Sequence, residues 1–342
     1  MTSLHCFTSA SFTYLDRARV LAESVRLHHP DWQFHLLLCD DDPEGLNWSP
    51  ESDVFDSVLR TSALDIPEYR RWAFGHNIVE FCTAVKGFML ERLLASGQHV
   101  IYLDPDIQIY SPLVEVEKLL EQHSVVLTPH LTSPETTIHG ITDNEIGSLR
   151  HGTYNLGFVA VRASDEGMAF ARWWRERLHR FCWDDISNGL FVDQRWCDLA
   201  PSLFDKVAVL RHPGYNVASW NLGARPIDIG VDGEITAANL PLRFFHFTKV
   251  NSVGENMLRR YAHGRLEVFE LLRHYRARLE AHRFADLPEG WWVFNHYSDG
   301  DPIPQSHRVL WRMRKDLRDA FANPFEAGPG SFKSWCAFND IG

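Results

Sequence analysis

Two aspartates one residue apart, Asp104 and Asp106, follow a short apolar segment in the stretch HVIYLDPDIQIY. The preceding residues, VIYL, are typical of a strand that is covered on both faces, as in a parallel sheet. Ligands of such sheets bind at the carboxyl ends of the strands. Two carboxylates there, with Pro105 stiffening the turn between them, form an oxygen site suited to Mg²⁺ or Mn²⁺ on a diphosphate. The alternative is an acidic turn, because Asp and Pro are both common turn residues.

The composition limits the class of protein. The chain has 342 residues, of which 45% are hydrophobic, so it can form one large α/β domain with an appendage or two small domains. Its formal net charge of -11 opposes a nucleic-acid partner. The start, MTSLHCFTSASF, lacks the charged residues and the apolar core of a signal peptide, and no apolar stretch is long enough to span a bilayer. These features predict a cytoplasmic protein. The 6 cysteines are scattered without a Cys-x-x-Cys pair, a pattern typical of reduced thiols that disfavours a zinc site.

The opening of the chain predicts a β-α-β unit of the nucleotide-binding kind. A strand is expected over residues 4–9, a helix over 15–28 and a second strand over 34–39. Three aspartates, residues 40–42, follow the second strand and suit either a ribose or base contact or a solvated turn. A long amphipathic helix over 76–96 then precedes the strand that carries the paired acids.

The remaining pattern predicts a sheet that continues well beyond this unit. Strands are expected over residues 125–127, 156–161, 207–210 and 243–247, with a helix over 168–181. Strands alternating with helices favour an α/β fold with a central sheet.

The composition changes beyond about residue 255, where strand patterns stop and arginines become frequent. The sequence therefore predicts two parts, a domain over 1–255 and a helical appendage over 256–342. Arginines alternate with apolar residues at helical spacing, as they do in interfacial helices. We therefore expect Arg259–Phe325 to capture an acceptor or to contact an anionic membrane surface. The alternative is a set of helices that pack on the core and solvate their arginines.

Four segments spread over residues 4–250 match the motifs of one family. They are YLDPD, TYNLGFVAVR, FVDQRWCDLA and RFFHFTKV. These segments resemble the strand-end Asp-x-Asp, the Asn-x-Gly, the Asp-Gln-Asp and the late strand-end His of the GT-A glycosyltransferases that use nucleotide sugars. The resemblance is greatest to the retaining group that includes glycogenin and the bacterial lipooligosaccharide galactosyltransferases. The chain departs from the pattern at Arg195, where the family has a third acid, and at Thr248 and Lys249, which follow the His.

This resemblance implies a GT-A (Rossmann-like) mixed sheet flanked by helices, and a divalent metal, Mn²⁺ or Mg²⁺. Asp104, Asp106 and His246 would be the metal ligands, and Asp104 would also lie near the donor ribose. A lone His beside aromatic residues is more often a core residue than a ligand. Its place at a strand end, far downstream of an Asp-x-Asp, reverses that preference.

The same resemblance names the catalytic candidates. It places Asn155 near the donor sugar and the acceptor. Asp193 and Gln194 would lie beside the reactive face of the sugar, where either stabilises developing oxocarbenium charge. An Asn before a tight Gly turn presents donors and an acceptor to sugar hydroxyls, or else it bonds its own backbone.

Four other residues are candidates for contacts with the donor. Thr8 and Ser9 end the first strand, where the nucleotide base is expected. Lys86 lies on the helix before the paired acids, where related enzymes carry a basic residue, and a solvated helix face is the equal alternative. Lys249 is expected to contact the diphosphate, although its position is shifted relative to the family.

The sequence thus predicts a metal-dependent transferase that moves a hexose from a nucleotide sugar, most simply a UDP-sugar, with retention. The resemblance implies that the acceptor is a bacterial surface glycan or its lipid-linked precursor. The reaction would then take place in the cytoplasm or at the inner face of the cytoplasmic membrane. A phosphohydrolase of the haloacid dehalogenase type also ends a strand in Asp-x-Asp. That class has a Thr or Val where this chain has Gln108. A sugar-nucleotide-binding protein without activity is the remaining alternative.

Overall fold

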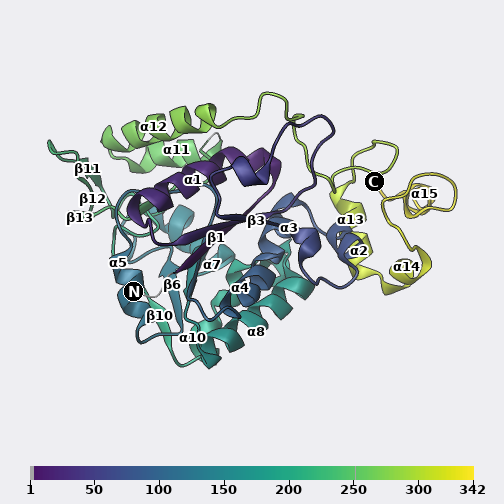
Figure 1. Ribbon diagram of the computed structural model, residues 1–342, viewed down its shortest axis with the longest axis horizontal. Coiled ribbons are helices and arrows are strands. Elements are labelled where there is room, and N and C mark those ends of the chain that lie inside the picture. Colours follow the sequence, from purple (N-terminus) through teal and green to yellow (C-terminus); the bar gives the residue numbers. More distant parts are fainter. Residues whose placement is uncertain (1–3, 251) are drawn as a thin grey trace.

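A seven-stranded sheet lies at the centre of the computed structural model, which describes residues 4–250 and 252–342 (Figure 1). In spatial order its strands are β10 (Val207–Val209), β6 (Val125–Pro129), β7 (Tyr154–Val161), β4 (Val100–Leu103), β1 (His5–Ala10), β2 (Gln33–Leu38) and β3 (Ser57–Arg60). β7 is antiparallel to both of its neighbours, and the other neighbouring strands are parallel. The structure confirms the predicted α/β class with a mixed sheet.

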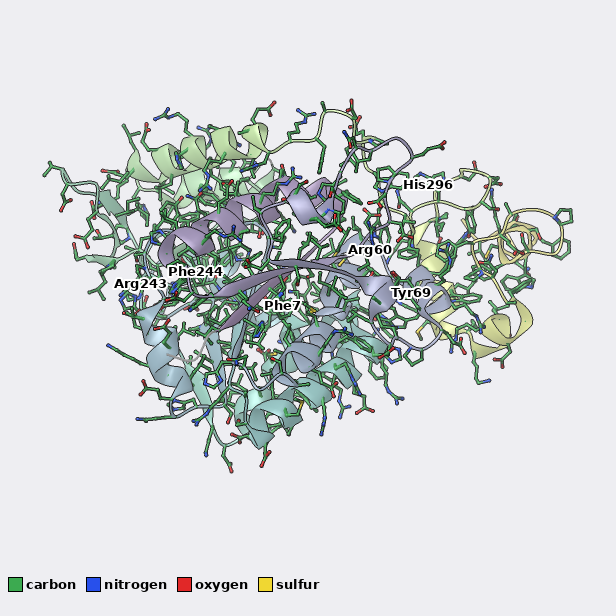
Figure 2. All side chains as sticks on the ribbon, viewed as in Figure 1. Phe7, Arg60, Tyr69, Arg243, Phe244 and His296 are labelled. Atoms are coloured by element: carbon green, nitrogen blue, oxygen red, sulfur yellow. The ribbon has the colours of Figure 1, made fainter. Side chains whose placement is uncertain are left out.

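Helices cover both faces of this sheet (Figure 1). The larger ones in the first two thirds of the chain are α1 (Leu15–His28), α2 (Tyr69–Phe74), α3 (Ile78–Ala84), α4 (Lys86–Leu94), α5 (Val114–Leu120) and α8 (Asp165–Phe181). Residues of α2, α3, α4 and α8 share one buried cluster with Phe7, which lies near the middle of the molecule (Figure 2). α1 and α5 share a second cluster with Ile101 and Phe158 on the other face.

Shorter elements connect the sheet to its surroundings. The short helices are α6 (Ile138–Gly140), α7 (Ile146–His151), α9 (Gln194–Cys197) and α10 (Ala200–Leu203). The short strands outside the main sheet are β5 (Ile107–Ile109), β8 (Asp184–Asp185), β9 (Leu190–Phe191), β11 (Ile227–Ile229), β12 (Ile235–Ala237), β13 (Leu240–Pro241) and β14 (Phe244–His246). β14 pairs antiparallel with β5 rather than joining the main sheet.

The expected helix over 76–96 is two helices, α3 and α4, separated at Val85. α3 begins with a capping box in which Asn77 and Glu80 satisfy each other's backbone N–H groups. α4 begins at Lys86, and its Gly87 lies so close to α8 that an added Cβ would be 2.5 Å from Cα of Arg175. Lys86, the first residue of α4, therefore stands one residue before a close contact between α4 and α8.

The C-terminal region is helical, as predicted. Its helices are α11 (Val253–Tyr261), α12 (Glu267–Ala281), α13 (Gln305–Met313), α14 (Lys315–Ala320) and α15 (Phe332–Phe338). α11 and α12 lie beside α1, whereas α13 to α15 lie at the far side near α2 (Figure 1). Trp292, Trp311 and Phe332 belong to the same buried cluster as Phe7. The C-terminal region therefore shares hydrophobic cores with the sheet.

The arginines of the C-terminal helices have acidic partners. Arg276 lies 2.6 Å from Glu255, and Arg278 lies 2.5 Å from Glu23 of α1. The remaining arginines between residues 259 and 283 also form ion pairs. Two of these pairs, Arg260 with Asp143 and Arg265 with Asp228, link this region to distant parts of the chain. None of the helices in the described part of the chain is both long and apolar enough to cross a bilayer.

Candidate active site

The paired acids and the late histidine come together because β5 and β14 pair with each other. Asp104 and Asp106 flank the turn between β4 and β5. The antiparallel register sets His246 opposite Ile107, and the backbone N–H of Phe247 donates to the carbonyl of Asp106 at 2.8 Å. Two residues separated by 140 positions in the chain, Asp106 and His246, are thereby fixed side by side.

The three side chains have the geometry of a metal site. Nε2 of His246 lies 3.0 Å from Oδ1 of Asp106 and 3.8 Å from Oδ2 of Asp104. One ligand atom from each residue can be chosen so that all lie within 4.8 Å of one another. Carboxylate oxygens and an imidazole nitrogen are suitable ligands for Mn²⁺, and the carboxylates also suit Mg²⁺.

A neighbouring amide holds His246 in the tautomer that a ligand needs. The side-chain amide of Asn216 donates to Thr128 at 2.9 Å and to Asn155 at 3.0 Å, so its oxygen is left to face His246. That oxygen lies 3.2 Å from Nδ1 of His246 and accepts a hydrogen bond from it. Nδ1 therefore donates its proton to Asn216, which leaves Nε2 to face the two carboxylates and to bind a cation once the proton that it shares with Asp106 is displaced.

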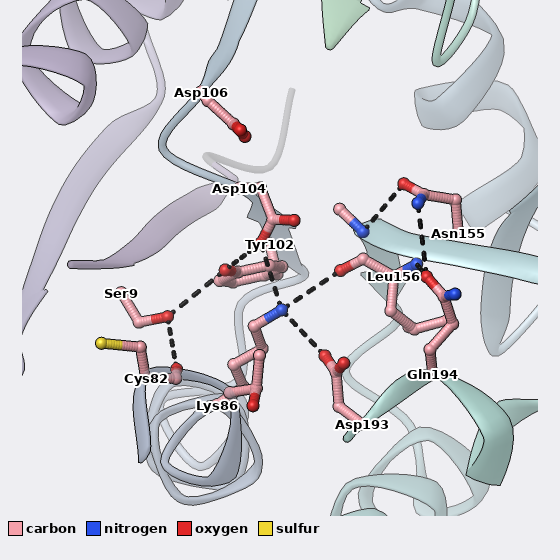
Figure 3. A network of polar contacts seen from close by, with 12 residues as sticks. Ser9, Cys82, Lys86, Tyr102, Asp104, Asp106, Asn155, Leu156, Asp193 and Gln194 are labelled. Atoms are coloured by element: carbon pink, nitrogen blue, oxygen red, sulfur yellow. Dashed lines mark hydrogen bonds and ion pairs between the residues drawn. The ribbon is translucent and has the colours of Figure 1, made fainter. Parts of the chain in front are cut away.

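Lys86 lies at the centre of the charged cluster (Figure 3). Its ammonium donates to Asp193 at 2.8 Å and to Asp104 at 3.1 Å, and it lies 4.2 Å from the ring centre of Tyr102. Tyr102 in turn donates to Asp104 at 2.5 Å. The expected alternative for Lys86, a solvated helix face, does not apply, because its side chain is 2% exposed.

Burial and neighbouring charge act in opposite directions on these groups. Burial alone would lower the pKa of Lys86, but Asp104 and Asp193 raise it well above its usual value. Burial raises the pKa of Asp193, and the attraction of Lys86 offsets this only in part. Burial would lower the pKa of His246, yet the nearby Asp106 raises it. The cluster contains three carboxylates, those of Asp104, Asp106 and Asp193, of which two contact the one ammonium of Lys86, and this excess of negative charge suits a divalent cation.

Asn155 belongs to the same network, on β7. Its oxygen accepts from the N–H of Gly157 at 3.1 Å and from Asn216, while its amide lies 3.2 Å from Nε2 of His130. Gly157 is required by space: an added Cβ would lie 2.5 Å from Cε1 of His246 and 2.8 Å from Oδ1 of Asn155. Asn155 does bond its own backbone, as the alternative interpretation holds, and it also links β7 to the metal-site histidine through Asn216.

Gln194 and Asp193 have different surroundings although they are adjacent in the chain. The oxygen of Gln194 accepts from the N–H of Leu156 at 3.1 Å, and its amide donates to the carbonyl of His151 at 2.9 Å (Figure 3). The carboxylate of Asp193 instead faces Lys86. These contacts suit Gln194 to positioning β7 and Asp193 to setting the charge at the site.

The donor-contact candidates are not all in one place. Ser9 lies close to the cluster, where its hydroxyl donates to the carbonyl of Cys82 at 2.8 Å and lies 3.3 Å from the hydroxyl of Tyr102. Thr8 is fully buried in β1, and its hydroxyl has no hydrogen-bond partner among the described residues. Lys249 is exposed, with a left-handed backbone at φ 49°, and forms no ion pair within the part of the chain that the structure describes.

Sequence reasoning missed Asn216, Tyr102 and His130 as members of the site. Tyr102 stands inside YLDPD and could have been noted, since a strand residue two positions before Asp104 points to the same face. Asn216 lies outside any strand with φ 52°, and its contacts with Thr128 and Asn155 span more than 60 residues. No local pattern marks such a residue.

Comparison with known proteins found one curated relative and several similar solved structures. No protein-family profile matches it. The uncharacterized protein YfnD of Bacillus subtilis (strain 168) is 24% identical over 261 residues, which cover 75% of this chain and 80% of YfnD. Among solved structures, the galactosyltransferase LgtC in complex with donor and acceptor sugar analogs has 14% identity and a TM-score of 0.45, with coverage of 84% of this chain and 98% of LgtC.

Two other glycosyltransferase structures are similar to a comparable degree. One is a glycosyltransferase involved in the glycosylation of the major capsid of PBCV-1, with 10% identity, a TM-score of 0.41 and coverage of 75% of this chain and 98% of that protein. The other is the glycosyltransferase GlyE of Streptococcus pneumoniae TIGR4, with 14% identity, a TM-score of 0.41 and coverage of 84% and 66%.

Proposed function

We propose that this protein is a metal-dependent glycosyltransferase that moves a hexose from a nucleotide sugar, most simply a UDP-sugar, to a glycan or lipid-linked acceptor. The observation that supports the proposal best is the convergence of Asp104, Asp106 and His246, with Asn216 holding His246 in the tautomer of a ligand. This arrangement lies beyond the carboxyl end of β4, where α/β sheets bind their ligands.

The proposed chemistry is the separation of a sugar from a diphosphate. A divalent cation held by Asp104, Asp106 and His246 would offset the negative charge that grows on the departing diphosphate. Lys86 holds Asp104 and Asp193 in place with its buried ammonium, so that neither carboxylate has to reorganise during the reaction. Asp193 supplies negative charge beside the position where the sugar becomes cationic.

The acceptor hydroxyl must then attack the anomeric carbon. Retention of configuration is the outcome that we propose, because Asp193 is engaged by Lys86 rather than free to act as a general base. Asn155 and Gln194 order the start of β7 beside this position, and Ser9 is proposed to lie near the base of the nucleotide. Thr8 is fully buried behind it in β1 and is not proposed as a contact. Proton NMR of the anomeric coupling in the product tests retention.

Asp106→Asn is the sharpest test of the metal site. The substitution keeps the size of the side chain and removes the charge that faces His246, so metal-dependent turnover should be lost while the fold persists. Removing the metal arrangement should raise the barrier by on the order of several kcal/mol. His246→Ala should weaken metal use less, because water can fill the vacated position.

The assay measures release of the nucleoside diphosphate from a panel of nucleotide sugars, with Mn²⁺, with Mg²⁺ and with chelator. Asp205→Asn is the matched control, since Asp205 is exposed and outside the cluster. Metal-dependent thermal stabilisation by the same nucleotide sugars reports binding separately from turnover. Full activity of Asp106→Asn in chelator would contradict the proposal, and binding without turnover of any donor would favour a silent sugar-nucleotide-binding protein.

The setting at the inner face of a bacterial cytoplasmic membrane also remains a proposal. The helices α11 and α12 carry the arginines that suggested it, and most of these arginines already face carboxylates. Flotation with anionic liposomes at low salt tests the contact, and the absence of binding would remove it.

A further inference from the structure

A cavity of about 280 Å³ lies between α2, the C-terminal end of α8 and the helices α13 and α14. α2 and α13 lie side by side at this place (Figure 1). None of Asp104, Asp106, His246 or Lys86 lines the cavity. α3 separates the two places, because it begins beside the cavity at Asn77 and leads to Lys86 at the candidate active site.

Indole rings and guanidinium groups form the wall of this cavity. Trp72, Trp183 and Trp311 all line it. The guanidinium carbon of Arg312 lies 4.5 Å from the ring centre of Trp183, and that of Arg71 lies 5.7 Å from the ring centre of Trp311. Flat aromatic faces pack against apolar faces of sugar rings, and arginines bind carboxylates and phosphates through paired N–H groups.

The charge of the wall is positive in a protein that is negative overall. The lining arginines are Arg71, Arg180, Arg312 and Arg318. Three carboxylates oppose them: Glu68 lies 2.8 Å from Arg71, the buried Glu80 lies 2.9 Å from Arg312, and Glu176 lies 3.4 Å from Arg180. Four guanidinium groups against three carboxylates leave a small excess of positive charge here, although the chain carries a formal net charge of -11. Such a wall favours an anionic ligand.

Several nitrogens around the cavity lack partners among the described residues. They are Nε of Arg71, Nε2 of His76, Nε2 of His179 and Nε of Arg312. A buried polar group without a partner is unfavourable, so four of them around one cavity are a reason to look for a ligand.

His76 adds a hydrogen-bond acceptor to these donors. Its Nδ1 lies 2.9 Å from the carbonyl of Trp72 and must donate to it. Burial lowers the pKa of His76 to about 4, so the ring is neutral at pH 7 and Nε2 carries a lone pair. Its side chain is 3% exposed. A sugar hydroxyl is a donor of the kind that such a nitrogen accepts.

We propose that this cavity binds one anionic sugar residue, a pyranose that carries a carboxylate or a phosphate. The volume suits a single sugar ring, the half-buried Trp72 and Trp183 supply its apolar contacts, and the arginines select its charge. The proposal goes beyond the transferase function and does not depend on it, because the cavity and the metal site share no side chain.

Isothermal titration calorimetry in chelator tests the proposal with four probes: glucuronate, glucose 6-phosphate, glucose and inorganic phosphate. At least one of the two anionic sugars should bind, with glucose weaker by about tenfold or more because it lacks the charge–arginine contact. Comparison of glucuronate with glucose 6-phosphate identifies the anionic group. Equal binding of glucose and both anionic sugars would overturn the charge selection. Equal binding of inorganic phosphate and glucose 6-phosphate would overturn the sugar site.

Two substitutions on α8 locate the binding. Arg180 lines the cavity, whereas Arg172 lies on the same helix outside it, and their side chains are similarly exposed at 62% and 65%. Arg180→Gln should weaken binding about two- to fivefold, and Arg172→Gln should leave it unchanged. A third substitution lies just beyond α8: Trp183→Ala removes a partly exposed ring and should weaken binding on the order of tenfold.

Equal effects of the two arginine substitutions would overturn the location. Asp106→Asn separates this site from the proposed active site: titration of that variant should match the titration of the unaltered protein. Loss of sugar binding in Asp106→Asn would mean that the probes occupy the metal site instead, which would also overturn the proposal.

Discussion

Replacing Lys86 with methionine should destabilise the protein strongly and in a way that a second substitution reverses. Methionine keeps most of the side-chain volume but removes the ammonium that lies 2.8 Å from Asp193 and 3.1 Å from Asp104. Asp193 is itself 4% exposed, so its charge is left in the interior without this partner. Removing one member of a buried ion pair costs about 3–5 kcal/mol. We expect about 4 kcal/mol from urea unfolding, a large share of the 5–15 kcal/mol that is typical of domains.

Two further variants separate this explanation from a general loss of packing. In Lys86→Met with Asp193→Asn, the second buried charge is gone, so the double variant should recover about 1–3 kcal/mol relative to Lys86→Met. Lys315→Met is the matched control, because Lys315 is 79% exposed and its pair with Asp319 should contribute less than about 1 kcal/mol. A loss below about 1 kcal/mol in Lys86→Met, or a double variant no more stable than Lys86→Met, would refute the reasoning.

Two other predictions concern Gly157 and Asp40. Gly157→Ala forces a Cβ to within 2.5 Å of His246, so the affinity for Mn²⁺, measured by electron paramagnetic resonance, should fall about 10–100-fold; unchanged affinity would show that His246 is not a ligand. Burial raises the pKa of Asp40 to about 7, above the roughly 3.9 of an unfolded chain, so the folded state holds this proton more tightly. The free energy of unfolding should therefore fall as pH rises from about 4 to 7, and Asp40→Asn should flatten that part of the profile; parallel profiles for both proteins would contradict this assignment.

The sequence predicted those parts of the structure that depend on local patterns. α1 and β4 lie at the expected residues, because amphipathic spacing and an unbroken apolar run are local signals. The division between α3 and α4 was missed, since Val85 itself is helical in backbone geometry and nothing in its type ends a helix. Gly87 was the available sign, because a glycine inside a helical pattern often marks the close approach of another element.

The candidate site shows more clearly that local sequence patterns do not reveal contacts between distant residues. Motif resemblance named the three residues that lie together here, Asp104, Asp106 and His246, but it could not reveal the contact between β5 and β14 that joins them. β5 has three residues, too few for periodicity to mark its partner. Glu80 illustrates a second difficulty, because a carboxylate that is 0% exposed looks in sequence like any acid on an amphipathic helix. Its role in the capping box is local, but its pair with Arg312 joins residues that are 232 positions apart.

Asp104 links the two halves of the charged cluster. One oxygen faces Lys86 and Tyr102, and the other faces His246. The first contact anchors Asp104 to α4 and to the core below the sheet, so the side chain enters the metal site already oriented. The described side-chain contact of Asp106 is with His246, and no contact with α4 is described for it. The two aspartates of one motif therefore have different surroundings: Asp104 connects the site to the folded core, and Asp106 would contribute its charge to the cation that we propose for this site.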